Sequence, residues 1–443
     1  MYSAKALKEL GKRGIREGDR IGLVAFGKQL EGTLMPRIEA GDEDALVVKL
    51  DSGYNAGVSV DSCQSIRKIS NRQEAQAKAA GLEFDSSKPK VAVVATGGTI
   101  STRVDYRTGG VFMTLDPRDI LATAPELASF ANIASIDSPF RIASEDMAPK
   151  EWREIARAVA KRLDEGCVGA VITHGTDILH YTAAALSFML TNLGKPVAVA
   201  GAQRSPDRAS FDGRLNLACA ARYAVSGIPR VAVVMHGSSS DDYCYAHPGT
   251  KVRKMHTSRR DAFQTINAKP LAKIWADGKL EKLADAGEGH GGKTKVDDRF
   301  EDKVAIVKPF PGANPGIMDY FTERKYKGII VEATGLGHVP TETIDKKMSW
   351  IPAVRRAVDA GAFVGVTSQC VYGRVNPFVY RNLRLLAATG AVHLEDMLTE
   401  TAFVKLGCAL GREKKLDKVR EFMLANVAGE YGERITQDLY PEI

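Results

Sequence analysis

The sequence predicts an α/β protein: a small β-barrel at the N-terminus, followed by a two-lobed α/β fold with mainly parallel sheets. Short β-rich runs between residues 20 and 60 are separated by glycine, aspartate and asparagine turns at intervals of about ten residues, which is typical of a small barrel. From Lys90 onward, short apolar strands alternate with helical segments, as in repeated βα units. A chain of 443 residues is also too long for one ordinary domain.

The expected domain boundaries follow changes in composition. Residues 1–70 begin with a short helix, continue with the β-rich runs and have the size of an SH3-like barrel. Residues 71–89 are polar and end at a proline, which is typical of a linker. We expect one α/β domain over 90–303 and a second over 304–443, with the glycine- and charge-rich stretch 276–303 exposed at their boundary.

Apolar, β-branched runs predict the strands of the α/β region. They lie at 91–95, 168–173, 197–201, 230–235, 304–308, 328–332 and 362–366. A helix is predicted over 149–165, because a proline begins it, one stripe of its residues is apolar and a glycine follows it. We expect another helix over 179–190, and further helices roughly over 342–359 and 394–426.

Composition narrows the class of protein. A hydrophobic content of 44% with 26% charged residues is typical of a soluble globular protein, and the sequence predicts no membrane span and no signal peptide. The six cysteines form no CxxC pair, which argues against a zinc site or a disulfide framework and favours a cytoplasmic location. The net charge of +7 permits contact with RNA without requiring it.

The first candidate functional stretch is the turn Thr96-Gly97-Gly98-Thr99, which follows the strand at 91–95. Its two glycines allow a sharp bend and a close approach of a ligand to the main chain. Ligands bind at the carboxyl ends of parallel strands, where this turn should lie. A threonine there is either a nucleophile or part of a phosphate cradle.

A second turn, His174-Gly175-Thr176-Asp177, also follows an apolar strand and precedes a helix. Thr176 or Asp177 could simply cap that helix. Alternatively, both turns bring a threonine to the same crevice, where a hydroxyl nucleophile needs a base or a cation to lose its proton. Lys254, in the polar loop 251–257, could supply that group beside Asp177, or it could be an ordinary surface lysine.

Three segments resemble, in order, the motifs of the bacterial-type L-asparaginases: Thr96-Gly-Gly-Thr-Ile100, His174-Gly-Thr-Asp177 and Lys254-Met-His-Thr-Ser-Arg-Arg-Asp-Ala-Phe-Gln-Thr-Ile-Asn267. The resemblance covers residues 90–425 and implies an asparaginase-like fold with no metal and no cofactor. It implies that Thr99 is the first nucleophile, assisted by Tyr106. A second catalytic group would comprise Thr176, Asp177 and Lys254.

The same resemblance implies where the substrate binds. Ser144 and Glu145 match the pair that holds the α-carboxylate and α-amine of the amino-acid substrate, although free asparaginases usually have glutamine in place of Glu145. Backbone N–H groups at Gly98 and Gly175 can donate hydrogen bonds to the developing oxyanion.

Other stretches resemble a narrower group. The N-terminal barrel, the segment 47–57 and the tail 424–434 are similar to those of the archaeal glutamyl-tRNA(Gln) amidotransferase D subunits, over nearly the full length. This resemblance implies an amidase that releases ammonia from glutamine or asparagine. A partner, the E subunit, would bind misacylated Glu-tRNA(Gln), activate it with ATP and Mg²⁺, and use the ammonia to make Gln-tRNA(Gln). The implied assembly is a hetero-oligomer, a dimer of heterodimers.

Three alternatives stay open at this point. One is a free-standing L-asparaginase with an accessory barrel, and another is a non-catalytic scaffold or tRNA-binding protein. The third is a nucleotide-binding protein, which the absence of GxxxxGK[ST] and of GxGxxG after the strand at 91–95 disfavours.

Overall fold

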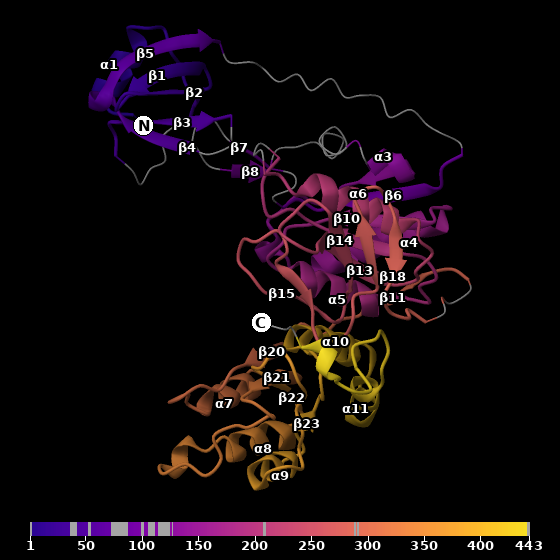
Figure 1. The fold of residues 1–443 in the computed structure, drawn as a ribbon. Coiled ribbons are helices and arrows are strands. Elements are labelled where there is room, and N and C mark those ends of the chain that lie inside the picture. Colours follow the sequence, from indigo (N-terminus) through magenta and orange to yellow (C-terminus); the bar gives the residue numbers. More distant parts are fainter. Residues whose placement is uncertain are drawn as a thin grey trace.

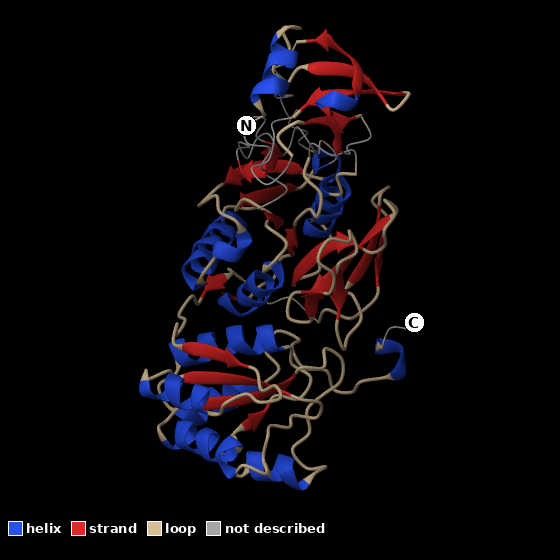
Figure 2. Cartoon of the chain, turned by 90° about the vertical axis from the view of Figure 1, so that its left-hand side faces the viewer, coloured by secondary structure: helices blue, strands red, loops and turns tan. Residues whose placement is uncertain are grey.

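The computed structural model describes residues 2–35, 42–51, 55–71, 87–98, 102–104, 111–113, 125, 127–206, 210–287, 289 and 292–440. Three bodies follow one another along an elongated molecule, in the order of the sequence (Figures 1 and 2). An N-terminal β domain lies at one end, a large α/β domain in the middle and a smaller α/β domain at the other end.

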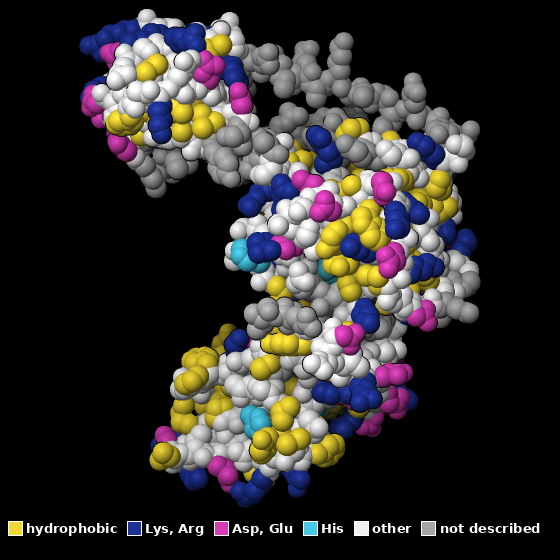
Figure 3. Space-filling view, in the orientation of Figure 1, with side chains coloured by type: hydrophobic (Ala, Val, Ile, Leu, Met, Phe, Trp, Pro, Cys, Tyr) yellow, Lys and Arg dark blue, Asp and Glu magenta, His cyan; other side chains and the backbone are white. Residues whose placement is uncertain are grey.

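The N-terminal body is an antiparallel β domain, as predicted. Its sheet has the order β4-β3-β2-β1-β5. The strands are β1 (Arg20–Ala25), β2 (Lys28–Leu34), β3 (Ala45–Leu50), β4 (Asn55–Ser59) and β5 (Cys63–Ser70). Helix α1 (Ala4–Gly11) packs Ala6 and Leu10 into the same core as Ile21 and Leu23 of β1. Figure 3 shows Lys and Arg side chains gathered along the α1 and β5 side of this domain.

The middle domain is built on an eight-stranded sheet of order β18-β17-β14-β13-β12-β10-β6-β9. The parallel strands are β6 (Lys90–Ala95), β9 (Asn132–Asp137), β10 (Gly169–Thr173), β12 (Val197–Ala200) and β13 (Val231–His236). Three antiparallel strands extend it: β14 (Tyr243–Pro248), β17 (Ala272–Trp275) and β18 (Leu280–Lys282). The sheet is therefore mixed, and its parallel half is the part that the sequence predicted.

Helices cover both faces of this sheet, because its central strands are apolar on both sides. On one face, α4 (Pro149–Asp164) and α5 (Leu179–Met189) pack on Ala92 and Val94. On the other face, α3 (Leu127–Phe130) and α6 (Gly213–Ala224) pack on Val91 and Ala95.

The C-terminal domain has a parallel four-stranded sheet of order β20-β21-β22-β23. Its strands are β20 (Val304–Val307), β21 (Gly328–Ala333), β22 (Phe363–Ser368) and β23 (Val392–His393). Helices α7 (Gly316–Glu323), α8 (Ile351–Asp359) and α9 (Arg381–Ala387) contribute to the core on one face. Helices α10 (Thr399–Arg412) and α11 (Leu416–Leu424) cover the other.

Two predicted helices are shorter than expected. Of 342–359, only α8 is α-helical, because the Asp345 carboxylate accepts a hydrogen bond from Lys347 N at 3.0 Å and closes a single 3-10 turn instead. The stretch 394–426 begins with Glu395 at a φ of 50° and divides into α10 and α11, since Glu413 and Lys415 have extended backbones.

The stretch 276–303 is not simply an exposed insertion. It contains β18 and also β19 (Lys295–Val296), which pairs with β11 (Leu190–Thr191). Phe300 is buried against α10, where Gly407 leaves room for its ring.

Two short hairpins complete the described structure, β7 (Thr102–Val104) with β8 (Val111–Met113), and β15 (Val252–Lys254) with β16 (Phe263–Thr265). Within the part of the chain that the structure describes, no helix is both long and apolar enough to cross a membrane.

Candidate active site

The two predicted turns lie side by side, because β6 and β10 are neighbouring parallel strands with Ala95 opposite Thr173. Both turns therefore emerge at the carboxyl edge of the sheet. Thr96 is fully buried, and both its backbone N–H and its hydroxyl donate to Thr173 O, at 3.1 and 2.9 Å. The hydroxyl of Thr96 thus joins the two strands and is not a free nucleophile.

Glycine lets the two turns touch. Gly97 and Gly98 have φ values of 111° and 78°, a left-handed conformation that favours glycine. A Cβ atom on Gly98 would collide with the backbone of Gly175. A Cβ atom on Gly175 would in turn lie 2.8 Å from the Oγ of Ser144. The two turns are consequently packed backbone against backbone, and the Ser144 side chain lies directly against Gly175.

Lys254 connects the residues of the second turn. Its Nζ donates to Thr176 Oγ1 at 2.9 Å and to Asp177 Oδ1 at 2.7 Å. Lys254 is the last residue of β15, so the polar loop expected here is in part a strand. Helix α5 begins after Ile178 with no side-chain cap, which removes the interpretation of Thr176 or Asp177 as capping residues. Their side chains contact the lysine instead.

The site is shielded on one side and open on the other. The Lys254 side chain is 10% exposed and that of Asp177 is 62% exposed, so solvent reaches the ion pair through the carboxylate. Burial lowers the pKa of His180 to about 3 and that of His174 to about 4, so both imidazoles are neutral near pH 7. Asp177 is therefore the group that balances the lysine charge.

His174 is a residue whose role the sequence did not reveal. It is fully buried, its Nδ1 lies 2.6 Å from Gly175 O, and its Nε2 lies 2.9 Å from Thr182 Oγ1 on α5. With both ring nitrogens engaged, it fixes the turn to the helix. The spacing from His174 to Thr182 spans a turn and a helix start, so no regular sequence period indicated the contact.

Ser144 and Glu145 lie in a 3-10 turn (Ser144–Asp146) beside the glycine turns. Ile142 N donates to Thr96 O at 3.1 Å, which ties this segment to the first turn. Ser144 is buried, and its Oγ lies 3.4 Å from a carboxylate oxygen of the exposed Glu145. The structure thus brings together Gly98, Ser144, Gly175, Thr176, Asp177 and Lys254.

Two predicted catalytic residues, Thr99 and Tyr106, lie outside the described residues. Among the described residues, no group of three or more histidine, cysteine or acidic side chains is arranged to hold a metal ion.

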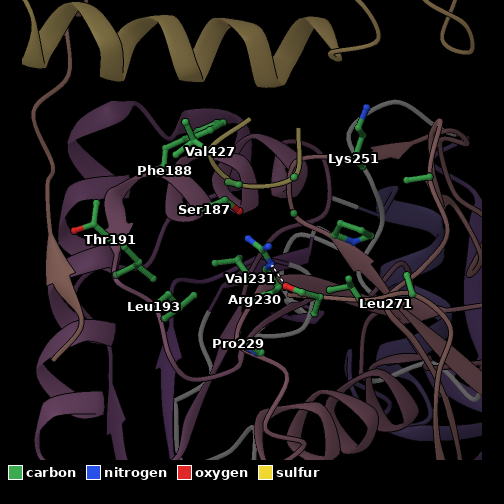
Figure 4. A pocket seen from close by; sticks show the side chains of 18 of the residues that line it. Ser187, Phe188, Thr191, Leu193, Pro229, Arg230, Val231, Lys251, Leu271 and Val427 are labelled. Atoms are coloured by element: carbon green, nitrogen blue, oxygen red, sulfur yellow. Dashed lines mark hydrogen bonds between the residues drawn. The ribbon is translucent and has the colours of Figure 1, made fainter. Parts of the chain in front are cut away.

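A cavity of about 500 Å³ lies at the opposite edge of the sheet, near the start of β13 (Figure 4). Three of the cations that line it have structural partners: Arg230 donates to Ala286 O, Lys251 to Asp396, and Arg412 to Phe188 O. The predicted residues that the structure describes gather at the other edge, which makes the carboxyl edge the candidate active site.

Comparisons with known proteins show which family the chain resembles. Residues 90–286 match the model of the asparaginase N-terminal domain, 303–423 the glutaminase/asparaginase C-terminal domain, and 15–69 the GatD N-terminal domain. The glutamyl-tRNA(Gln) amidotransferase D subunit of Pyrococcus furiosus is 48% identical over 431 residues, covering 95% of this chain and 96% of the relative. That of Sulfurisphaera tokodaii is 42% identical, covering 99% and 97%.

The chain belongs to the family of glutamyl-tRNA(Gln) amidotransferase D subunits.

Solved structures of L-asparaginases share the fold of most of this chain. The thermostable L-asparaginase from Thermococcus kodakarensis superposes with a TM-score of 0.68 at 29% identity, covering 78% of this chain and all of that one. L-asparaginase I from Vibrio cholerae gives 0.67 at 27% identity, covering 78% and 99%. The GatD N-terminal match, at residues 15–69, ends before the asparaginase matches begin.

Proposed function

We propose that this chain is the amidase component of a tRNA-dependent amidotransferase, which releases ammonia from glutamine or asparagine. A partner, the E subunit, would use the ammonia to convert Glu-tRNA(Gln) to Gln-tRNA(Gln), with ATP and Mg²⁺ consumed at the partner and no cofactor in this chain. The observation that carries the proposal is the contact of Lys254 with both Thr176 and Asp177, beside the paired glycine turns. Such an arrangement can hold a hydroxyl and move its proton.

The proposed reaction has two steps. Thr99, assisted by Tyr106, attacks the side-chain amide carbon, and the C–N bond breaks as ammonia leaves with the proton of the hydroxyl. Water near Thr176, Asp177 and Lys254 then attacks the acyl ester, which restores the threonine and releases the carboxylic acid. Backbone N–H groups of the two glycine turns stabilise the oxyanion in both steps.

The substrate-binding part of the proposal concerns Ser144 and Glu145. The 3-10 turn sets Ser144 next to Gly175, and Glu145 follows it in the same turn. Ser144 would hold the α-carboxylate, and Glu145 would accept the α-ammonium group, since a carboxylate pairs with a cation more strongly than an amide does.

The context of the site favours transfer of ammonia to a second protein. Relatives that match over nearly the whole chain are named as one component of an amidotransferase, and the N-terminal β domain is the part that the asparaginase matches leave uncovered. We propose a cytoplasmic hetero-oligomer, a dimer of heterodimers, with an enclosed route for ammonia between its chains. The basic side of the β domain would lie near the tRNA that the partner holds.

Ammonia release from each amide, with and without the partner and charged tRNA, tests the proposal. We expect Thr99→Ala, Thr176→Val and Lys254→Met to lose release while keeping the fold. Lys269→Met is the matched control, because that lysine is exposed and pairs with Asp438 away from the turns. Unchanged release in Thr99→Ala would remove the nucleophile assignment.

A second candidate function is that of a free-standing asparaginase with an accessory domain. It is supported by the match to L-asparaginase structures whose chains are covered almost completely by this one. It predicts full activity of the chain alone and no stimulation by charged tRNA. A chain that releases no ammonia in any mixture would instead be a scaffold.

A further inference from the structure

The hairpin that carries Lys254 is held by the C-terminal domain. Three residues before Lys254, the Nζ of Lys251 donates to Asp396 Oδ2 at 2.6 Å and to Asp396 O at 3.2 Å. The two side chains are 1% and 0% exposed, so this is a fully buried ion pair between the middle and C-terminal domains. Such a pair has a narrow range of acceptable geometries, because its charges lose their hydration if they separate within the protein.

Further contacts hold the same segment from the same side. Thr401, on α10, donates its hydroxyl to Thr250 O at 2.9 Å. Glu400, also on α10, lies 3.1 Å from the guanidinium of Arg253. Residues 250, 251 and 253 are thus each attached to the C-terminal domain.

The other end of the hairpin is attached in the same way. Asn267, just after β16, donates to Gly373 O and accepts from Gly373 N, both at 3.0 Å. Asp396 is itself fixed, because Gly432 N donates to its carboxylate at 3.1 Å. The hairpin therefore rests on an anchored surface at both ends.

Lys254 itself faces the other way. Successive residues of a strand point to opposite sides, so Arg253 reaches Glu400 of the C-terminal domain while Lys254 reaches Thr176 and Asp177 of the middle domain. Among the described residues, the charged and titratable groups around Lys254 include Asp177 and the neutral His174 of the second turn, the neutral His180 of α5, and its strand neighbour Arg253. The backbone of Lys254 is thus held from two sides: Val252 and Phe263 of its hairpin are buried in the core of the middle domain, and the contacts above attach the ends of the hairpin to the C-terminal domain.

We propose that Asp396 is a positioning residue for Lys254: through its buried pair with Lys251, it sets the distance from the Lys254 amine to Thr176 and Asp177. This inference rests on the function proposed above, in which Lys254 belongs to the catalytic group. The C-terminal domain then contributes to catalysis by holding Lys254, a residue of the middle domain, at the correct distance from Thr176 and Asp177. A displacement of about 1 Å at such a group is enough to lower the rate about 100-fold.

The experiment compares Asp396→Asn with Glu430→Gln in the full chain with its partner. Glu430 pairs with Lys405, both side chains are 0% exposed, and both belong to the C-terminal part of the chain. Each substitution neutralises one carboxylate of a buried pair, so both variants lose stability in the same manner. Only Asp396→Asn is expected to lower kcat about 100-fold with little change in KM, and to shift the pH profile of kcat.

A second measurement follows Lys254 without relying on catalysis. The rate at which limiting acetic anhydride modifies the Lys254 amine is measured by peptide mass spectrometry, with Lys269 in the same sample as the reference. We expect Lys254 to react several-fold faster in Asp396→Asn than in the wild type or in Glu430→Gln. If wild-type protein releases no ammonia, the proposed function fails, while the labelling still decides the positioning role.

Should Asp396→Asn fail to fold, Thr401→Val replaces it, because it removes one hydrogen bond to Thr250 O and leaves the ion pair intact. We expect the same direction of change in kcat and in labelling, at smaller amplitude. Equal kcat, pH profile and labelling in the Asp396 or Thr401 variant and in Glu430→Gln would overturn the inference.

Discussion

Gly98 and Gly175, which follow two neighbouring strands, are in direct backbone contact, and no Cβ atom fits on Gly98. The contact joins the turn that precedes Thr99 to the turn that contains Thr176. The distance between the two halves of the candidate site is therefore set by main-chain atoms, which cannot change rotamer.

We expect Gly98→Ala to lower ammonia release by about 100-fold or more, because the added methyl group must push the two turns apart. Gly361→Ala is the matched control, since Gly361 has a similar φ of 85° but open space around it. The control should lose about 1–2 kcal/mol of stability and keep its activity. Ammonia release by the two variants is compared at a temperature where both are folded. Equal release by Gly98→Ala and Gly361→Ala would contradict the prediction.

Acidification should destabilise the protein through His174. Burial lowers its pKa in the folded state from 6.5 to about 4, so between these values the unfolded chain binds a proton that the native state does not. The stability present above pH 6.5 is lost as the pH falls toward 4, by about 3 kcal/mol for this residue. Urea unfolding across this range should show a shallower pH dependence in His174→Gln than in the wild type. The same pH dependence of the unfolding free energy in both proteins would exclude His174 as its cause.

The buried pair of Lys405 and Glu430 should behave as a unit. Lys405 Nζ on α10 lies 2.5 Å from Glu430, in the tail beyond α11, and also donates to Met423 O on α11. It thus attaches α10 to both α11 and the tail. Glu430→Gln alone leaves a buried ammonium group unbalanced and should cost about 3–5 kcal/mol. The double variant Lys405→Met/Glu430→Gln should be less destabilised than the sum of its single variants. A double-mutant cycle from urea unfolding measures this coupling, and additive effects would argue against it.

The N-terminal β domain should unfold on its own. Its hydrophobic core cluster is made of residues between Tyr2 and Ile66. We expect a chain of residues 87–443 to keep the melting temperature of the main transition and to lose a separate, smaller one. Differential scanning calorimetry of the full and shortened chains measures the number and the midpoints of these transitions. Aggregation of the shortened chain on expression would show that the two parts depend on each other.

Much of the fold near the candidate site could be predicted because it rests on local patterns. Helix α4 ends one residue from its predicted limit, since Pro149 and the apolar stripe determine its position and face. The strands β6 and β10 could be located because they are apolar on both faces, and the turns after them because glycine follows directly.

Long-range contacts explain what sequence patterns could not show. The strands β14, β17 and β18 extend the sheet by antiparallel pairing, β14 on β13 and the other two in turn, and the positions of these partners are not visible in the sequence. The support of Lys254 depends on Asp396, more than a hundred positions away, and even the nearer contact of His174 with Thr182, eight positions away, crosses from a turn into a helix. Side chains that meet only after the chain has folded leave no spacing to recognise.

The buried pair of Lys251 and Asp396 also bears on how this chain could be divided into fragments or recombined with a homologue. If the chain were cut between the two α/β domains, the first fragment would keep Lys251 but lose Asp396. The Lys251 amine, buried in the intact protein, would then be exposed to water. Neither half could be exchanged for that of a distant homologue unless both members of the pair travelled together. The two α/β domains should therefore be exchanged together in evolution, although each has its own sheet.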